Sequence, residues 1–253
     1  MSSVLVVGAT RGLGASITKH YAEKGWSVYG TARSKNHPDG FPNSVKWLPD
    51  VDLMNSDVGE TIVSSLKESG PLDLVVITAG IFKTESFEDG PNWNDEVRMY
   101  TTSSIAPVFI IHRLSHAGLL RKGSKVVLVS SEAGSVALRT EAEGNYAHHA
   151  SKAALNMAGR LLAFDLKEKE VVVSIIHPGF MRTEMTRGVG FDQYWDQFHA
   201  VKPDEAAKSL ADWADQLDIS KTGQFWAPRG PKDIGTAEAV LGSDLPTPLE
   251  LPW

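Results

Sequence analysis

The sequence predicts an α/β fold, in which one doubly wound domain has a parallel seven-stranded sheet with helices on both faces. Three observations support this prediction. Strand-like apolar runs alternate with helix-like periodic segments, which is the pattern of a parallel sheet covered by helices. The length of 253 residues suits a single domain, 1–253, with a large core. The first strand-like run also leads through a glycine-rich turn directly into a helix-like segment.

The first strand and helix are predicted around that turn. Four apolar residues, three of them β-branched, occupy 4–7, glycines follow at 8, 12 and 14, and a helical pattern covers 12–24. Glycine lacks a Cβ, so the backbone can approach a phosphate while the unpaired N–H groups of the helix face the anion. The turn therefore predicts a dinucleotide pyrophosphate site, and a glycine-rich turn without a ligand is the alternative.

The later elements follow in alternation. Further strands are expected at 26–31, 45–48, 72–78, 125–130, 171–177 and 223–227, and helices at 56–68, 93–119, 146–168 and 203–217. Pro203 opens the last helix, with Asp204 and Glu205 in its first turn. The chain has no internal repeat, and the segment 228–253 is a tail rich in proline and glycine.

Composition limits the classes of function. The net charge of −6 argues against nucleic acid or an anionic membrane as the main partner, because both require a basic face, so we expect a small-molecule substrate. The absence of cysteine excludes disulfides, thiol catalysis and zinc–thiolate sites. No signal-peptide pattern precedes the first strand and no apolar run approaches the length of a membrane span, so a cytoplasmic location is expected.

Further motifs follow the predicted strands in a characteristic order. They are Gly-x-x-x-Gly-x-Gly at 8–14, Thr-Ala-Gly at 78–80, Ser-Ser-Glu-Ala-Gly at 130–134, Ser-Lys-Ala-Ala-Leu-Asn at 151–156 and His-Pro-Gly-Phe-Met-Arg-Thr at 177–183. From residue 4 to about 227 the chain resembles the short-chain dehydrogenase/reductase family, and the final Leu-Pro-Trp resembles the end of its small carbonyl reductases. The resemblance implies a Rossmann-fold oxidoreductase that binds a nicotinamide dinucleotide.

Charge at the second strand favours NADP(H) over NAD(H). A 2′-phosphate needs cations, whereas an NAD site usually places a carboxylate there. Arg33 follows the strand and Arg11 lies in the glycine turn, although both could be solvated surface groups. The resemblance adds Asp52 and Leu53 at the adenine, with Asp50 as the less favoured register. The predicted cofactor residues are Gly8, Thr10, Arg11, Gly12, Leu13, Gly14, Arg33, Asp52, Leu53, Ala79, Gly80, Lys152, Pro178, Gly179 and Thr183.

The catalytic positions depart from the family pattern. Family members use Tyr-x-x-x-Lys, in which the phenol gives a proton to the substrate oxygen and the lysine lowers the phenol pKa. Counting back four residues from Lys152 gives His148, whereas Tyr146 lies on another face of the helix. Ser103 stands where the family has an asparagine. The resemblance therefore implies a site of Ser131, His148, Lys152 and Ser103, in which Ser131 would hydrogen-bond the substrate oxygen.

His148 has two interpretations. An imidazole has an unperturbed pKa near 6.5 and can exchange a proton, although a charged Lys152 beside it would favour the neutral form and make it a poorer donor. Alternatively, the redox chemistry of the family has been lost and His148 only fills space. A metal bound by His148 and His149 has little support, because helix neighbours point about 100° apart and no third ligand is evident.

The segment 184–200 resembles the substrate lid of the family. It combines glycines with four aromatic residues, which favours a bulky, flat or apolar substrate, although packing against the core would give the same composition. Three functions remain open: an NADP(H)-dependent carbonyl or alcohol oxidoreductase, an enzyme of this fold with a non-redox isomerisation or cyclisation step, and a non-catalytic NADP(H)-sensing protein. The resemblance also implies a homodimer or homotetramer, paired through a helix that carries Leu155, Ala158, Leu161, Leu162 and Leu166.

Overall fold

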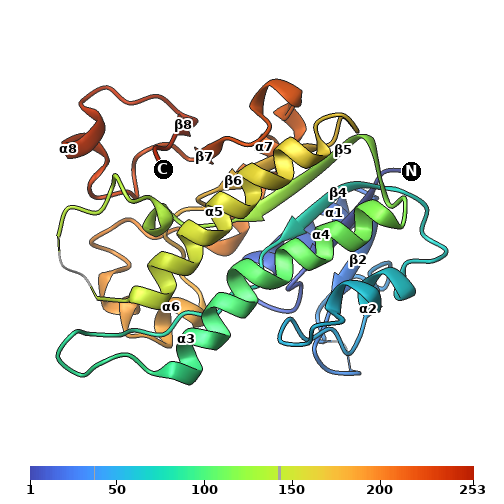
Figure 1. The fold of residues 1–253 in the computed structure, drawn as a ribbon, viewed down its shortest axis with the longest axis horizontal. Coiled ribbons are helices and arrows are strands. Elements are labelled where there is room, and N and C mark those ends of the chain that lie inside the picture. The colour runs from blue at the N-terminus through green and yellow to red at the C-terminus, as the bar shows by residue number, and fades with distance from the viewer. Residues whose placement is uncertain (37, 142–143) are drawn as a thin grey trace.

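The computed structural model describes residues 1–36, 38–141 and 144–253 and contains one eight-stranded sheet. The strands are β1 (Ser3–Val7), β2 (Ser27–Thr31), β3 (Lys46–Leu48), β4 (Leu72–Ile77), β5 (Leu120–Val129), β6 (Val172–Ile176), β7 (Phe225–Ala227) and β8 (Leu249–Glu250). Their order in space is β3-β2-β1-β4-β5-β6-β7-β8, and neighbours from β3 to β7 run parallel (Figure 1). The chain crosses from one half of the sheet to the other between β3 and β4.

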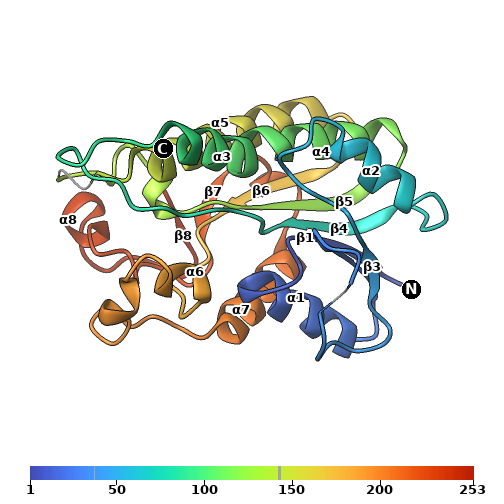
Figure 2. The ribbon, with the colours of Figure 1, turned by 90° about the horizontal axis from the view of Figure 1, so that it is seen from below.

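Helices cover both faces of this sheet. The helices are α1 (Gly12–Glu23), α2 (Val58–Ser65), α3 (Trp93–Tyr100), α4 (Ala106–His116), α5 (Tyr146–Leu166), α6 (Glu184–Arg187), α7 (Pro203–Gln216) and α8 (Ala237–Leu241). Figure 2 shows α2, α4 and α5 on one side of the strands and α1 and α7 on the other. The predicted doubly wound α/β class is therefore confirmed.

Each face of the sheet has its own apolar core. Because side chains alternate along a strand, Leu5 and Val7 pack with α2, α4 and α5, whereas Val4 and Val6 pack with α1 and α7. All four side chains are fully buried, as expected for parallel strands covered on both sides. No helix in the described part of the chain is long and apolar enough to cross a membrane.

Several elements differ from the sequence prediction: β5 begins at Leu120, five residues before the expected strand 125–130, and α6 and α8 were not predicted. The tail adds β8, which pairs antiparallel with β7, so the sheet has eight strands where seven were predicted. The expected helix 93–119 contains a π-helical segment, Thr101–Ile105, between α3 and α4. Pro107 follows that segment and has no N–H to donate to the carbonyl of Ser103, which explains why the regular α-helical ladder is interrupted there.

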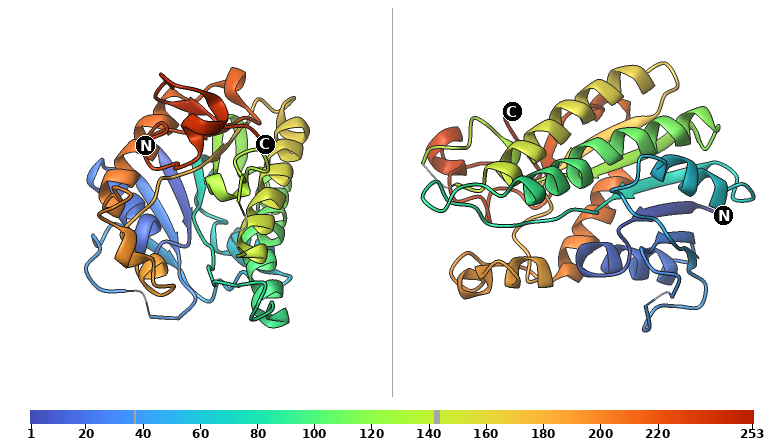
Figure 3. Two further views of the ribbon diagram at one scale, coloured as in Figure 1. Left: turned by 90° about the vertical axis from the view of Figure 1, so that its left-hand side faces the viewer. Right: turned by 60° about the horizontal axis from the view of Figure 1, so that its bottom comes forward.

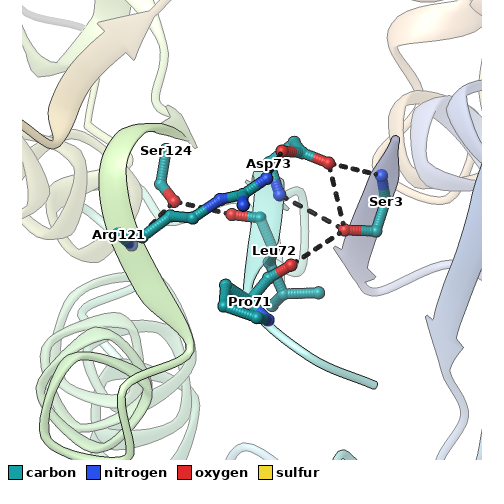
Figure 4. A network of polar contacts seen from close by, with 6 residues as sticks. All are labelled: Ser3, Pro71, Leu72, Asp73, Arg121 and Ser124. Carbon is teal, nitrogen blue, oxygen red and sulfur yellow. Dashed lines mark hydrogen bonds and ion pairs between the residues drawn. The ribbon is translucent and has the colours of Figure 1, made fainter. Parts of the chain in front are cut away.

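A polar network holds three strands together near their amino ends (Figure 4). Asp73 of β4 accepts hydrogen bonds from the backbone N–H of Ser3 in β1 (2.8 Å) and from the guanidinium of Arg121 in β5 (2.7 Å). The hydroxyl of Ser124 donates to the carbonyl of Leu72 (2.6 Å) and accepts from the N–H of Arg121 (2.9 Å). The network fixes the strand ends opposite the edge where the glycine turn lies.

Candidate active site

A cavity of about 690 Å³ opens at the carboxyl ends of the parallel strands. Its lining comes from the segments that follow β1, β2, β3, β4, β5 and β6, from α3 and the π-helical segment after it, from the start of α5, and from the segment between β7 and α8. This is where open α/β sheets bind ligands, at the point where the strand order reverses. Every predicted cofactor residue lines the cavity: Gly8, Thr10, Arg11, Gly12, Leu13, Gly14, Arg33, Asp52, Leu53, Ala79, Gly80, Lys152, Pro178, Gly179 and Thr183.

The glycine turn has no room for side chains at two of its positions. Gly8 has φ +89°, and a Cβ built on it would lie 2.8 Å from the backbone nitrogen of Ala79. A Cβ on Gly14 would lie 2.1 Å from the carbonyl oxygen of Gly8. Gly12 also has a positive φ, +53°, and begins α1. The result is an open backbone cradle at a helix N-terminus, which fits a pyrophosphate.

The cationic groups expected at the adenosine end lie at the rim of the cavity. Arg33 is exposed, and Arg11 forms an ion pair with Glu184 (3.8 Å) in which both side chains are largely exposed. Asp52 lines the cavity and accepts a hydrogen bond from the N–H of Met54 (3.0 Å). Asp50 is not among the lining residues, so the favoured register with Asp52 is the one that reaches the cavity.

Lys152 is buried beside the end of β5. Its ammonium donates to the carbonyl of Val129 (2.8 Å), and burial lowers its pKa to about 8. Ser131 is the N-cap of a short 3₁₀ turn, and its hydroxyl accepts from the N–H of Ala133 (3.2 Å). A Cβ built on Gly80 would lie 3.8 Å from Lys152 Nζ and 4.0 Å from Ser103 Oγ, so both groups lie against this glycine.

Ser103 is the one predicted site residue that does not line the cavity. It lies in the π-helical segment, is 1% exposed, and its hydroxyl has no hydrogen-bond partner among the described residues. The hydroxyl therefore lies behind Gly80 rather than on the cavity surface. A buried hydroxyl without a partner is uncommon, and water is the simplest group to satisfy it there.

His148 lies on the cavity surface, and Tyr146 does not. The imidazole stacks at an angle against Phe82, with 4.2 Å between ring centroids, and its Nδ1 has no hydrogen-bond partner within the described chain. Burial, and then the charge of Lys152, lower the pKa of His148 to about 3, so the ring is neutral near pH 7. Tyr146 is 40% exposed and does not line the cavity.

The segment 184–200 contributes aromatic and thioether side chains to the lining. It starts at α6, where the hydroxyl of Thr183 accepts from the N–H of Thr186 (3.2 Å), and continues through a 3₁₀ turn, Phe191–Tyr194. Phe191 packs edge-to-face on Phe82, with 5.4 Å between centroids. The apolar residues of this segment that line the cavity are Met185, Phe191, Tyr194 and Phe198.

Sequence reasoning missed several residues of this wall. Phe82 comes from the segment after β4, Asp233 and Thr236 come from the segment between β7 and α8, and Glu132 forms an ion pair with Arg139. No motif marks Phe82, Asp233 or Thr236, and Glu132 lies in the motif at 130–134 but was given no role. The one available signal was that both segments follow the carboxyl ends of strands, where ligand-binding loops gather. No group of three metal-binding side chains is found among the described residues.

Comparison with known proteins finds several similar chains whose names describe dehydrogenases or reductases. The family model described as short chain dehydrogenase matches residues 2–193. A 1-hydroxy-2-glutathionyl-2-methyl-3-butene dehydrogenase from Rhodococcus sp. (strain AD45) is 30% identical over 235 residues, covering 89% of this chain and 96% of the relative. The NADPH-bound carbonyl reductase from chicken fatty liver has a TM-score of 0.78 at 21% identity, covering 100% of this chain and 94% of that one. A carbonyl reductase from Pseudomonas aeruginosa PAO1 has a TM-score of 0.75 at 24% identity, covering 100% of both chains.

Proposed function

This chain belongs to the short-chain dehydrogenase family, and from that premise we propose that it is an NADP(H)-dependent oxidoreductase that interconverts a carbonyl and an alcohol on a bulky or aromatic small molecule. One observation carries the proposal: a single cavity joins the glycine cradle to Ser131, His148 and Lys152. The names of relatives agree with it, since one is a dehydrogenase of a hydroxy compound and another a carbonyl reductase with NADPH bound.

The cofactor would be held by groups already described. The N–H groups of the glycine turn suit the pyrophosphate, Arg11 and Arg33 suit the 2′-phosphate, and Asp52 suits the adenine amine. NADP(H), when bound, supplies or accepts the hydride. The remaining task of the protein is to orient the substrate oxygen and to manage its proton.

The proton chemistry is assigned to three side chains. Ser131 donates a hydrogen bond to the substrate oxygen, and Lys152 is the reservoir of the proton, since a pKa of about 8 keeps most of it charged at neutral pH. His148 stays neutral and works as a relay, which takes a proton at one ring nitrogen as it gives one up from the other. In the direction of reduction the proton passes to the new alcohol, and Lys152 then recovers one from solvent.

The class of substrate follows from the lining. Phe82, Phe191, Tyr194 and Phe198 gather on the side of His148, with Met185 beside them in the lid. Such a wall favours an aromatic or bulky apolar group next to the reacting carbon. We infer that the segment 184–200 acts as the lid over that group.

A non-redox reaction is the second candidate, and the low pKa of His148 favours it. A pKa of about 3 makes the imidazole a weak base and removes its charged form, so it is a poor replacement for a phenol. An isomerisation or cyclisation that depends on cavity shape and on Lys152 would not require His148 to transfer a proton. A non-catalytic NADP(H)-sensing role is the outcome if neither chemistry is found.

We also propose that the active form is a homodimer or homotetramer. Leu155, Leu162 and Leu166 pack inward on the sheet, but Leu161 and Phe164 on the outer side of α5 are 54% and 56% exposed. The right-hand view of Figure 3 shows α4 and α5 side by side as one outer layer, to which α4 adds Phe109, which is 48% exposed. A second copy would cover that layer.

The decisive test follows the absorbance of reduced nicotinamide when aromatic aldehydes and ketones are added to the protein with NADPH. Oxidation that depends on both protein and carbonyl compound supports the oxidoreductase. NADPH binding without any oxidation across the panel favours the second candidate, and conversion of a ligand at constant absorbance establishes it. Failure to bind NADPH contradicts all three functions.

A further inference from the structure

Three polar atoms in the cavity wall around the Pro178–Gly179 turn are buried without a hydrogen-bond partner in the described part of the chain. They are His177 Nε2, Asp233 Oδ1 and Thr236 Oγ1, and all three residues line the cavity. The proposed hydride and proton transfers use none of them. Burying a polar group without a partner is costly, so three in one wall indicate that a bound molecule completes their hydrogen bonds.

The carboxylate of Asp233 is held rigidly with one oxygen left over. Its Oδ2 accepts from the backbone N–H of Phe180 (2.9 Å) and lies 3.7 Å from Arg229 Nε. A Cβ built on Gly179 would lie 2.4 Å from the same oxygen, so the carboxylate packs directly on the Pro178–Gly179 turn. The side chain is 2% exposed, and Oδ1 is its remaining acceptor.

His177 supplies a donor. Its Nδ1 accepts from the backbone N–H of Glu132 (3.0 Å), and burial lowers the pKa of the ring. A neutral ring whose Nδ1 is an acceptor carries its hydrogen on Nε2, which makes the unpartnered atom a donor. The hydroxyl of Thr236 can both donate and accept.

The charges near these atoms are balanced. Arg229 accompanies Asp233, and Arg139 forms an ion pair with Glu132 on the far side of His177. Among the described residues, no uncompensated negative charge is left beside these atoms to select a cation. The wall offers the free acceptor of Asp233, the free donor of His177 and the hydroxyl of Thr236. An uncharged group that donates one hydrogen bond and accepts another matches this set.

We propose that His177, Asp233 and Thr236 form a subsite that binds a hydroxyl group of the substrate. The subsite lies where the Pro178–Gly179 turn meets the segment between β7 and α8. The inference rests on the proposed function because it concerns the same cavity. It adds that the substrate is amphipathic, with an apolar part against Phe82 and the lid and a hydroxyl at this wall.

Binding in a complex that cannot react tests the subsite separately from catalysis. Phenyl ketones with a terminal hydroxyl on alkyl chains of increasing length, each paired with its methyl ether, are titrated by calorimetry into the protein saturated with NADP⁺. The ether keeps the acceptor but loses the donor, so the best-fitting hydroxy ketone should bind about tenfold more tightly than its ether.

Two variants remove single partners with little change of shape. Thr236→Val removes the hydroxyl, and His177→Asn keeps an acceptor for the Glu132 N–H while removing the donor at Nε2. Thr236→Val should reduce the affinity for the hydroxy ketone by about three- to tenfold and leave the ether nearly unchanged, whereas His177→Asn should weaken both ligands by about that factor, because the ether oxygen also accepts from Nε2. Thr140→Val, at an exposed threonine outside the cavity, is the matched control and should preserve the preference.

Three results overturn the proposal: no hydroxy ketone binds better than its ether, the preference survives undiminished in Thr236→Val, or a structure of the complex contains only ordered water between the three atoms. The affinity for NADP⁺ is measured first. If NADP⁺ does not bind, the proposed function fails, and the same titration without cofactor still decides whether the subsite prefers the hydroxyl.

Discussion

His148 and Lys152 lie one turn apart on α5, and burial lowers the pKa of both side chains. Lys152 has a pKa of about 8, so its charged form predominates at neutral pH and disappears as the pH rises through that value. His148 is already neutral across the range in which the protein would be assayed. The site therefore has one titrating group with a pKa in the neutral to alkaline range.

The first prediction concerns the pH dependence of carbonyl reduction. The rate at saturating NADPH should stay level from about pH 5.5 to 7 and fall as the pH rises through about 8, because the proton donor Lys152 loses its charge. The reverse oxidation should rise over the same interval. Stopped-flow or steady-state rates measure both, and a fall on the acid side near pH 6.5 would indicate an imidazole with an ordinary pKa instead.

The second prediction concerns His148 itself. If the ring relays the proton, His148→Phe should lower turnover about 100- to 10,000-fold while NADPH affinity stays near the parent value. His148→Tyr should retain or raise reductase activity, because it restores the family's Tyr-x-x-x-Lys. Tyr146→Phe is the matched control and should change turnover no more than a few fold, since Tyr146 lies outside the cavity. Turnover of His148→Phe within a few fold of the parent would mean that the ring only fills space.

The third prediction concerns cofactor choice. Arg33→Ala should weaken NADPH selectively, by about 1.5–3 kcal/mol for a charge-assisted contact with the 2′-phosphate, and should leave NADH affinity nearly unchanged. Lys35→Ala removes an exposed cation two residues away that does not line the cavity, so it is the control. Fluorescence titration with both cofactors measures the affinities, and equal affinity of the parent for NADPH and NADH would contradict the idea.

Residues were predictable from the sequence where backbone chemistry constrains them. Gly8 and Gly14 could be identified because nothing larger fits the turn, and His148 because a helix fixes the spacing to Lys152. Asp233 and Phe82 could not be identified. Their segments reach the cavity only through tertiary packing, and no local pattern records that approach.

Elements were predictable where periodicity is long and were missed where it is short. The mostly apolar sequences of β1, β4, β6 and the second half of β5 predict buried parallel strands, and these strands are found, although β5 begins at Leu120 rather than at residue 125. The two-residue strand β8 carries no period of its own. It is held by its antiparallel pairing with β7 and by the stacking of Trp253 on Phe225 (5.9 Å between ring centroids), which are long-range contacts.

The fourth prediction concerns the network that joins β1, β4 and β5. Burial opposes ionisation of Asp73, but the hydrogen bonds from Arg121 and Ser3 outweigh it and lower the pKa of the carboxyl. Asp73→Asn should therefore destabilise the protein by about 1–2 kcal/mol at pH 7. Because folding lowers this pKa, the stabilisation is present above the unfolded value of about 3.9 and is lost as the pH falls through the lower folded value.

Urea unfolding at a series of pH values measures that difference. The gap between the parent and Asp73→Asn should be constant from pH 7 to about 5 and should shrink below about 4. Asp39→Asn, at an exposed loop carboxylate, is the control and should leave the unfolding midpoint nearly unchanged. A gap that persists undiminished at the lowest pH would show that the carboxylate charge contributes nothing.

At the scale of the whole molecule, the two helical layers differ in how many large apolar side chains they expose to solvent. On the side of α1 and α7, the apolar side chains of α7 turn inward on the sheet. The outer side of α4 and α5 exposes Ile105, Phe109, Met157, Leu161 and Phe164, each by 48% or more. Five large exposed apolar side chains, on these two helices and on the π-helical segment that precedes α4, favour an interface at this layer.

The last prediction is that this surface pairs two copies of the chain. A two-fold contact sets α4 and α5 against the same helices of the partner, so each substitution acts twice, and one charge in the apolar centre should be enough to separate the copies. Light scattering at micromolar concentration should give at least twice the 27.5 kDa of one chain for the parent and close to 27.5 kDa for Leu161→Glu. Ile219→Glu places the same charge at an apolar residue that is 43% exposed outside this surface, and it should leave the mass unchanged. Helix α5 also carries His148 and Lys152. If separation of the copies makes this helix open more often, the separated form should lose activity to the same extent. Amide hydrogen exchange along 146–166 measures how often the helix opens. A parent mass near 27.5 kDa would leave the exposed side chains without a partner copy and would contradict the pairing.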